Sequence, residues 1–227
     1  VSIKGKRVAF LGAGNMGEAL IKGLAQAGLV PAGSITASDP RADHLGQIAK
    51  RYGIRAVADN IALVGGADVI ILAVKPQIMA AVLQEIASAV DDGKLLISIA
   101  AGVSTRKLRD QLGKPARLIR VMPNTPALVL EGVTAVARAE GLKPGDLEAA
   151  QELFAAVGKV VVLDESAMDA VTGLSGSGPA YVAIATLTWK AAFRFRLFWA
   201  LLVVLLISVV ALPLLLKDDG IARGFTQ

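Results

Sequence analysis

The chain has 227 residues, which is long enough for one good-sized domain and part of a second. It is 54% hydrophobic but only 4% aromatic, with no cysteine, one histidine and a net charge of +5 from scattered basic residues. This composition favours an aliphatic α/β core. It excludes disulfides, thiolate catalysis and a zinc–thiolate site. The basic residues form no stripe with interleaved aromatics, so we expect no nucleic-acid partner, and no metal site is predicted.

Short apolar runs alternate with longer helical patterns, which is typical of a parallel sheet covered by helices. The predicted strands are residues 8–11, 34–38, 54–58, 69–74, 95–99, 118–122, 133–137 and 160–163. The predicted helices are residues 15–27, 42–52, 78–90, 105–112 and 146–156, with start signals at Ser104 and Pro144 and stop signals at Gly28, Gly53, Gly113 and Gly158. Residues 69–74 are apolar on both faces, as in a central parallel strand. We therefore predict an α/β fold with a Rossmann-type dinucleotide-binding domain over residues 1–163.

The first predicted strand runs directly into Gly12-Ala13-Gly14-Asn15-Met16-Gly17, and a helical pattern follows. Each glycine has a separate predicted role: Gly12 permits the tight turn, Gly14 lets a pyrophosphate approach the backbone, and Gly17 lets the helix pack closely on the sheet. The N–H groups of the first helical turn would then face the phosphates. The motif predicts a dinucleotide site, although a plain glycine-rich turn is the alternative.

The second predicted strand ends in Ser38-Asp39-Pro40-Arg41, where a coenzyme's adenosine ribose would be recognised. Asp39 alone favours a free 2′-hydroxyl and hence NAD, whereas Ser38 and Arg41 favour a 2′-phosphate and hence NADP. Asp39-Pro40 also fits a helix-capping turn, and the sequence leaves the coenzyme open. His44, in the polar helical stretch that follows, is predicted to be a surface residue rather than a ligand or a catalytic base.

Four further motifs follow in order: Ala73-Val74-Lys75-Pro76, Ser98-Ile99-Ala100-Ala101-Gly102-Val103, Met122-Pro123-Asn124-Thr125-Pro126, and residues 171–181 with Ser175-Gly176-Ser177-Gly178 at their centre. Taken singly, these motifs also fit strand ends and rigid turns. Together with the glycine turn they closely resemble the pyrroline-5-carboxylate reductase family, from about residue 6 to about residue 185.

The resemblance implies reduction of 1-pyrroline-5-carboxylate to L-proline, the last step of proline biosynthesis, by a cytoplasmic homo-dimer or higher homo-oligomer. It implies that NADP(H) or NAD(H) contacts Gly12, Ala13, Gly14, Asn15, Met16, Gly17, Ser38, Arg41, Ala73, Lys75, Pro76 and Ala100. Asn124 and Thr125 would position the reacting ring, and Glu165, Ser175, Gly176, Ser177 and Gly178 would line the substrate side. A Rossmann-type domain followed by a helical dimerisation domain is the implied architecture.

A second family, the β-hydroxyacid dehydrogenases, has a similar fingerprint but a catalytic lysine four residues after a Gly-x-Gly. Here Gly176-Ser177-Gly178 is followed by Pro179-Ala180-Tyr181-Val182, so the lysine is absent. Oxidation of a hydroxyl requires a general base at that place. Imine reduction does not, because solvent can protonate the nitrogen, and the sequence therefore favours imine reduction.

After Thr186 the resemblance ends, and residues 197–216 carry no charge. About 20 apolar residues, or roughly 30 Å of helix, can cross a bilayer. Lys190, Arg194 and Arg196 precede them, which would keep the N-terminal domain in the cytoplasm. Three explanations remain open: a reading-frame change or truncation, a genuine membrane anchor, and a buried helix that replaces part of a dimer interface.

We therefore expect residues 164–188 to begin a truncated helical domain and residues 189–227 to form an atypical hydrophobic tail. The alternative function is a membrane-tethered or truncated protein that binds a nicotinamide dinucleotide without turnover.

Overall fold

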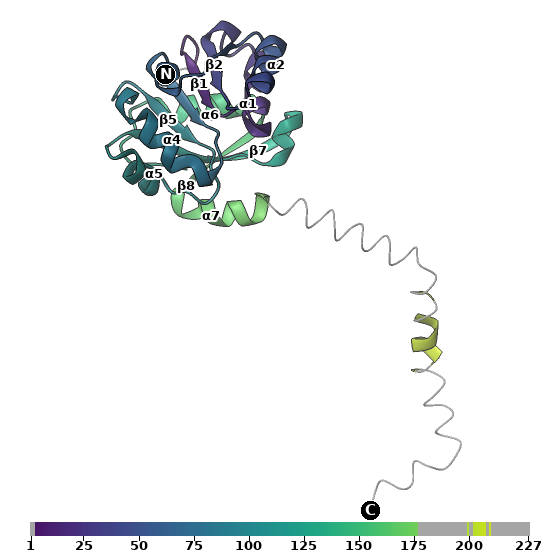
Figure 1. Ribbon diagram of the computed structural model, residues 1–227. Coiled ribbons are helices and arrows are strands. Elements are labelled where there is room, and N and C mark those ends of the chain that lie inside the picture. The colour runs from purple at the N-terminus through teal and green to yellow at the C-terminus, as the bar shows by residue number, and fades with distance from the viewer. Residues whose placement is uncertain (1–2, 177–198, 200–201, 208, 210–227) are drawn as a thin grey trace, which may run out of the picture. The chain divides into compact units, whose positions relative to one another are not determined.

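The computed structural model describes residues 3–176, 199, 202–207 and 209 (Figure 1), and the chain divides after Gly176 into two compact units. In the second unit the described residues are helical. The described part of the first unit contains an eight-stranded sheet with the order β3-β2-β1-β4-β5-β6-β7-β8. The strands are β1 (Val8–Leu11), β2 (Ile35–Ser38), β3 (Arg55–Ala56), β4 (Val69–Leu72), β5 (Leu95–Ser98), β6 (Arg117–Met122), β7 (Gly132–Arg138) and β8 (Gly158–Asp164). Every neighbouring pair is parallel except β6 and β7.

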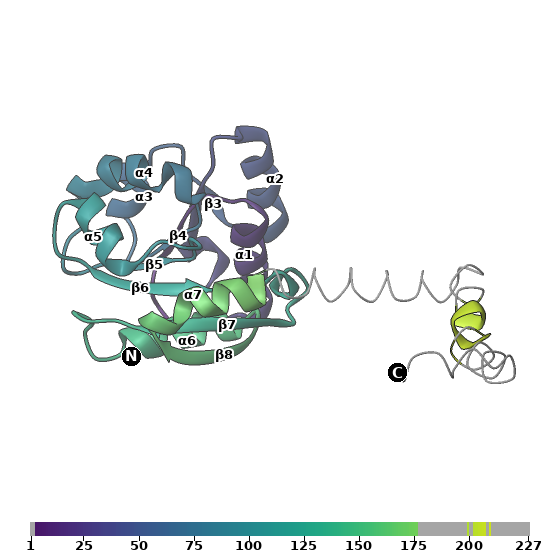
Figure 2. The same cartoon turned by 90° about the horizontal axis from the view of Figure 1, so that it is seen from below.

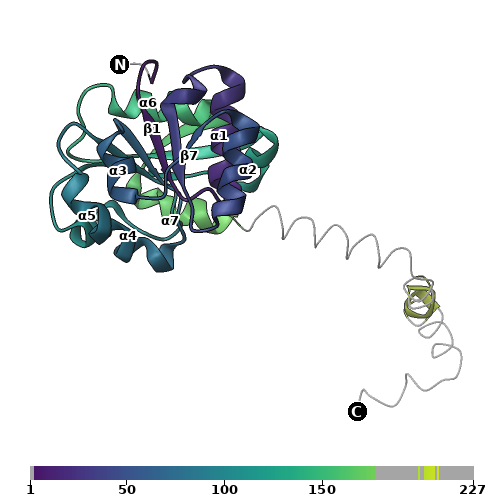
Figure 3. The ribbon, with the colours of Figure 1, turned by 45° about the horizontal axis from the view of Figure 1, so that its top comes forward.

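Helices cover both faces of this sheet. On one face lie α1 (Asn15–Ala27), α2 (Ala42–Tyr52) and α6 (Asp146–Ala155), which share one apolar core with the strands. On the other face α3 (Asn60–Gly65), α4 (Met79–Ile86) and α5 (Thr105–Leu112) form a second core. Figures 1 and 3 show α1 and α2 on one side of the sheet and α4 and α5 on the other. The predicted α/β fold of Rossmann type is confirmed.

The central strands are buried on both faces because successive side chains of a strand point to opposite sides. In β1, Val8 and Phe10 belong to the core beneath α1, and Ala9 and Leu11 belong to the core beneath α4. β4 lies between β1 and β5 and is buried throughout, as predicted for a central strand. The strand order reverses between β1 and β4. That boundary is the switch point beside which ligands bind in sheets of this kind.

The last two strands extend the sheet and carry the short helix α7 (Met168–Val171) on one face. Met168 packs against Ala135 and Ala137 of β7, and Figure 2 shows α7 lying across β6 and β7. The guanidinium of Arg120, on β6, is buried and lies 2.6 Å from the carboxylate of Asp169. This ion pair therefore fixes α7 to the sheet.

Most predicted boundaries agree with the structure within a few residues, and α1, α2 and α5 begin and end as predicted. The helix predicted over residues 78–90 is shorter, because 3-10 turns at Pro76–Ile78 and Ala87–Ala89 flank α4. Helix α3 was not predicted. Its six residues bury only Leu63 and Val64 as large side chains, which is too few to give a recognisable period.

The helix-end signals are confirmed except near α6. Ser104 caps α5, and Gly28, Gly53 and Gly113 end their helices in the left-handed conformation. Pro144 lies just outside α6, whose N-cap is Gly145. The prediction of Gly158 as a helix stop was wrong, because Gly158 begins β8 with φ +143°. A Cβ there would lie 2.0 Å from the carbonyl oxygen of Gly132, so close pairing with β7 requires the glycine.

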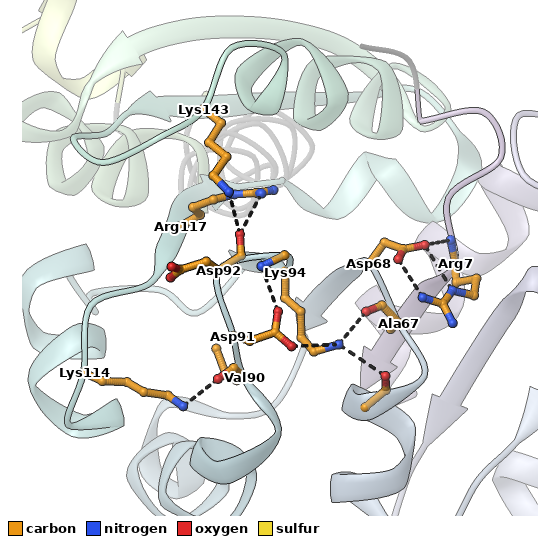
Figure 4. Close-up of polar contacts among 12 residues, drawn as sticks. Arg7, Ala67, Asp68, Val90, Asp91, Asp92, Lys94, Lys114, Arg117 and Lys143 are labelled. Atoms are coloured by element: carbon orange, nitrogen blue, oxygen red, sulfur yellow. Dashed lines mark hydrogen bonds and ion pairs between the residues drawn. The ribbon is translucent and has the colours of Figure 1, made fainter.

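Cationic side chains bind backbone carbonyl groups at the amino edge of the sheet (Figure 4). Lys94 donates to the carbonyls of Gly65 and Ala67, at 3.2 and 3.0 Å, beside the end of α3. Lys114 donates to the carbonyl of Val90, beyond the end of α4. Helix C-termini carry unpaired carbonyls and the negative end of the helix dipole, so these lysines stabilise the helix ends.

Among the described residues, none of the helices has both the length and the apolar character needed to cross a bilayer. Most of residues 197–216, where the sequence predicts a membrane segment, lies outside the described residues, as do Lys190, Arg194 and Arg196. The three explanations of the tail therefore stay predictions.

The packing of α1 on the residues that follow α6 yields a test of the fold. A Cβ at Gly23 in α1 would lie 2.6 Å from the Val157 side chain and 2.9 Å from the Ala156 carbonyl oxygen. Gly23→Ala should lower the free energy of unfolding by about 1–3 kcal/mol through overpacking, although alanine is the better helix former. In α2, no atom of the described residues outside the helix's own backbone and the chain neighbours lies within 4 Å of a Cβ at Gly46, so Gly46→Ala should raise stability by about 0.5–1 kcal/mol. Urea denaturation measures the free energy of unfolding of both variants. Equal changes in the two variants would contradict the close packing described at Gly23.

Candidate functional site

The predicted coenzyme residues of the N-terminal half converge at the carboxyl edge of the sheet. Gly12 follows β1, Ser38 ends β2, Ala73 follows β4 and Ala100 follows β5. Backbone hydrogen bonds join these ends, from Gly12 N–H to Ser38 O at 2.9 Å and from Ala73 N–H to Leu11 O at 2.8 Å. The parallel topology thus brings together residues that are up to 88 positions apart in sequence (Gly12 to Ala100, 100 − 12).

Two of the three glycines in the turn after β1 are required by neighbouring backbone. Gly12 has φ +97°, and a Cβ there would lie 2.7 Å from the Ala73 carbonyl oxygen. A Cβ at Gly17 would lie 2.5 Å from the Gly12 carbonyl oxygen. The crowding at Gly17 therefore comes mainly from the turn itself, with the side chain of Ala73 further away at 3.6 Å. Both glycines let α1 start directly at the switch point.

Gly14 differs from the other two glycines because, apart from its own chain neighbours, no atom of the described residues lies within 4 Å of the position a Cβ would take. Its backbone is extended, with φ −69° and ψ −175°, so the conformation does not demand glycine either. A side chain at Gly14 would occupy open space in front of the turn. That space is where a ligand can approach the backbone closely.

The start of α1 is left free of side-chain caps, in contrast to two other helices that begin at the same edge. No described side chain accepts a hydrogen bond from the first turn of α1. Asp59 caps α3, and Ser104 caps α5. Because the first N–H groups of a helix lack intrahelical acceptors, α1 presents donors and the positive end of its dipole to the open space at Gly14. This arrangement suits a diphosphate.

Asp39 joins the glycine turn to Arg41 through its carboxylate. Oδ2 accepts a hydrogen bond from the Ala13 N–H at 3.1 Å, and Oδ1 accepts from the Arg41 N–H at 3.0 Å. The Arg41 side chain donates to both oxygens, at 2.8 and 3.0 Å. Burial raises the pKa of Asp39, but the hydrogen bonds from Arg41 and Ala13 outweigh it and lower the pKa to about 2. Both carboxylate oxygens of Asp39 are therefore already hydrogen-bonded to protein groups.

Ser38 is oriented by a chain of polar contacts from two helices. Its side chain is buried, and the hydroxyl donates to Asn60 Oδ1 at 2.7 Å. The Asn60 amide donates to both carboxylate oxygens of Glu85, at 3.1 and 3.0 Å. Asn60 was not among the predicted site residues, because it begins α3, which was not predicted. These contacts fix Ser38 at the end of β2, three residues before Arg41, whose side chain is half-exposed.

The loop after β4 contains exposed residues, whereas the turn after β6 is hydrogen-bonded to β7. Lys75 and Pro76 are exposed. The Lys75 carbonyl accepts a hydrogen bond from the Ile78 N–H, whereas its side chain has no hydrogen bond or ion pair among the described residues. Asn124 Oδ1 accepts a hydrogen bond from the Val133 N–H at 2.8 Å, which joins the turn after β6 to β7. Thr125 is exposed at the start of a 3-10 turn, Thr125–Val129. A free cation and a hydroxyl group are thus present at this edge.

Glu165 binds the start of α5. Its carboxylate accepts hydrogen bonds from the Thr105 N–H at 2.7 Å and from the Thr105 hydroxyl at 2.5 Å. Ser175 and Gly176 belong to a π-helical turn, Thr172–Gly176, whereas Ser177 and Gly178 lie outside the described residues. The roles assigned to these residues on the substrate side stay predictions.

The mostly parallel sheet with its switch point, the tight glycine turn and the uncapped α1 define a Rossmann-type dinucleotide-binding protein. Residues 7–102 match the family model described as NADP oxidoreductase coenzyme F420-dependent. The chain is similar to the pyrroline-5-carboxylate reductase of Methanosarcina acetivorans, with 44% identity over 180 residues that cover 79% of this chain and 67% of the relative.

Solved structures agree with this likeness. A pyrroline-5-carboxylate reductase from Coxiella burnetii is 30% identical with a TM-score of 0.78, covering 94% of this chain and 81% of that one. The Plasmodium falciparum pyrroline carboxylate reductase with NADP bound is 28% identical with a TM-score of 0.73, covering 95% and 80%. The chain belongs to the pyrroline-5-carboxylate reductase family, as the sequence motifs predicted. It spans about two thirds of the length of the curated relatives that it matches.

The Asp39 contacts predict how stability depends on pH. The pKa of Asp39 is about 2 in the folded protein, below the ordinary value of 3.8. Its stabilising contribution is therefore present above pH 4 and is lost as the pH falls toward 2. The loss should be about 2 kcal/mol, and Asp39→Asn should flatten the decline of the unfolding free energy over this range.

Asp68 provides the matched control, because its carboxylate binds Arg7 at the opposite edge of the sheet and the Arg7 hydrogen bond lowers its pKa to about 2 as well (Figure 4). Asp68→Asn should flatten the decline to a similar extent. Denaturant titrations at several pH values measure both. A decline in Asp39→Asn as steep as in the wild type would contradict the assigned contacts.

Proposed function

We propose that this chain reduces 1-pyrroline-5-carboxylate to L-proline by hydride transfer from NADPH or NADH. The observation that carries the proposal is the empty space at Gly14 in front of the uncapped α1, in a chain of the pyrroline-5-carboxylate reductase family. A relative of the same family has been solved with NADP bound. The geometry described above fits such a dinucleotide.

The proposed coenzyme contacts follow the carboxyl edge of the sheet. Backbone groups of residues 12–17 hold the diphosphate, with the first-turn N–H groups of α1 as donors. Ser38 and Arg41 contact the adenosine end. The strand-end residues Ala73, Lys75, Pro76 and Ala100 lie along the nicotinamide half.

The proposed chemistry relies on orientation rather than on a dedicated acid. When bound, NADPH or NADH would supply the hydride for the carbon of the C=N bond, and water would supply the proton for the nitrogen. The protein's task is to hold the two rings at a reactive distance. Asn124 and Thr125 would position the substrate ring. Glu165, Ser175, Gly176, Ser177 and Gly178 would line its other side.

The assay of the intact chain should show NADPH oxidation that depends on 1-pyrroline-5-carboxylate, with proline as the product. Gly14→Ala should leave the melting temperature unchanged, since no described residue beyond its chain neighbours comes near the new Cβ, but raise the Kd for NADPH about tenfold or more. Gly46→Ala is the matched control and should bind like the wild type.

Two outcomes would change the proposal. NADPH binding to the wild type without turnover would support the alternative of a dinucleotide-binding protein without catalysis. No binding of either reduced coenzyme would overturn the proposal entirely.

We also propose NADPH rather than NADH as the preferred coenzyme. The preference for NADPH is supported by Asp39. Its carboxylate oxygens are already hydrogen-bonded to Ala13 and Arg41 and are not free to bind a ribose 2′-hydroxyl. The half-exposed guanidinium of Arg41 beside Ser38 offers a charge to a 2′-phosphate. Calorimetric titration should give a Kd for NADPH at least about tenfold below that for NADH. Equal affinities would refute this preference.

The remaining proposals concern assembly and location. We propose that residues 1–163 form the coenzyme domain, that residues 164–188 begin the helical substrate domain, and that the protein works as a cytoplasmic homo-oligomer. Family membership supports these proposals. The atypical tail, residues 189–227, leaves a membrane anchor as the alternative. Light scattering after size-exclusion chromatography tests the oligomer, and cell fractionation tests the location.

A further inference from the structure

Side chains from one segment hold both backbone polar groups of Ala13, which lies buried inside the glycine turn. Its N–H donates to Asp39 Oδ2 at 3.1 Å, and its carbonyl oxygen lies 2.9 Å from His44 Nε2. A carbonyl only accepts hydrogen bonds, so Nε2 carries the hydrogen and donates. Against the sequence-based expectation of a plain surface residue, the chain's single histidine therefore contacts the turn.

The position of His44 explains how it reaches the turn. It lies in the first turn of α2, directly after the residues that pair Asp39 with Arg41. Helical side chains lean toward the N-terminus of their helix. His44 consequently leans back along α2 toward the end of β2, where Gly12 N–H is bonded to Ser38 O.

Holding the Ala13 carbonyl also fixes the next N–H group. The peptide bond between Ala13 and Gly14 is planar and trans, so its N–H points away from its carbonyl oxygen. With the carbonyl directed at His44, the Gly14 N–H is directed to the opposite side. No described residue accepts a hydrogen bond from this N–H. It is left to the open space that surrounds the Gly14 Cβ position.

We propose that His44 is a positioning residue for coenzyme binding: by holding the Ala13 carbonyl, it aims the Gly14 N–H at the diphosphate. The inference rests on the proposed function, because it needs a dinucleotide at the turn. His44 itself touches no reacting atom in this account. It acts through the peptide group between Ala13 and Gly14.

Three substitutions at this position separate the hydrogen bond from other effects. His44→Leu removes the donor. His44→Gln keeps an N–H at about the reach of Nε2, and His44→Asn places one only at the reach of Nδ1, too short for the carbonyl. The Kd for NADPH should rise roughly five- to tenfold in the Leu and Asn variants, as for a lost hydrogen bond, and less than about twofold in the Gln variant.

A ligand without the diphosphate distinguishes positioning from a general loosening of the structure. Adenosine 2′-monophosphate would contact the region of Ser38 and Arg41 but has no diphosphate. Its Kd should stay within about twofold of the wild-type value in all three variants, and in turnover assays KM for NADPH should rise while kcat stays constant.

Equal weakening of both ligands in His44→Leu would overturn the inference, as would unchanged NADPH binding or a Gln variant as weak as the Asn variant. In each of these cases the wild type still binds NADPH, so the proposed function survives. A wild type that binds neither reduced coenzyme would overturn both.

Discussion

The close approach of the backbone at the ends of β1 and β4 is the constraint on which the site depends. The chain leaves β1 through Gly12, where any side chain would overlap the carbonyl of Ala73. Gly17 then packs on the carbonyl of Gly12, so only three residues, Gly12, Ala13 and Gly14, separate β1 from α1. A side chain at either glycine would separate the helix from the sheet. The helix start would then no longer face the switch point.

The polar groups at the helix ends have different partners at the two edges of the sheet. Parallel connections place the N-termini of α1, α3 and α5 at the carboxyl edge and the helix C-termini at the amino edge. At the amino edge, cations such as Lys94 and Lys114 bind the free carbonyls. At the carboxyl edge, α3 and α5 are capped by side chains, and α1 is not. Of these three helices, α1 is therefore the one whose first-turn N–H groups have no side-chain partner among the described residues and remain for an anion.

The glycine turn and the loop after β2 form one unit rather than two neighbouring contacts. Asp39 and His44 bind the N–H and carbonyl of Ala13, and Arg41 neutralises Asp39. The loop that would recognise the adenosine end therefore also fixes the shape of the turn beside the diphosphate. Substitutions in this loop can alter affinity at both places, which is why ligand fragments are needed to tell them apart.

The sequence predicted the features that depend on neighbours along the chain. Apolar periodicity gave the alternating strands and helices, and the glycine spacing located the turn after β1, because these patterns reflect local backbone geometry. Short elements such as α3 were not predicted, because six residues are too few to show a helical period of apolar residues. The ordered motifs were sufficient to indicate the family.

The tertiary structure alone decided which side chains hold the site. Asp39, His44 and Asn60 find their partners 26, 31 and 22 residues away, and Glu165 caps a helix 60 residues before it. Such pairs form only after the crossover connections have placed the strand ends side by side. Gly158 illustrates the same limit, because its close contact with Gly132 arises from strand pairing across 26 residues (158 − 132). Local sequence determines backbone conformation, whereas hydrogen-bond partners are selected by the proximity that the folded sheet creates.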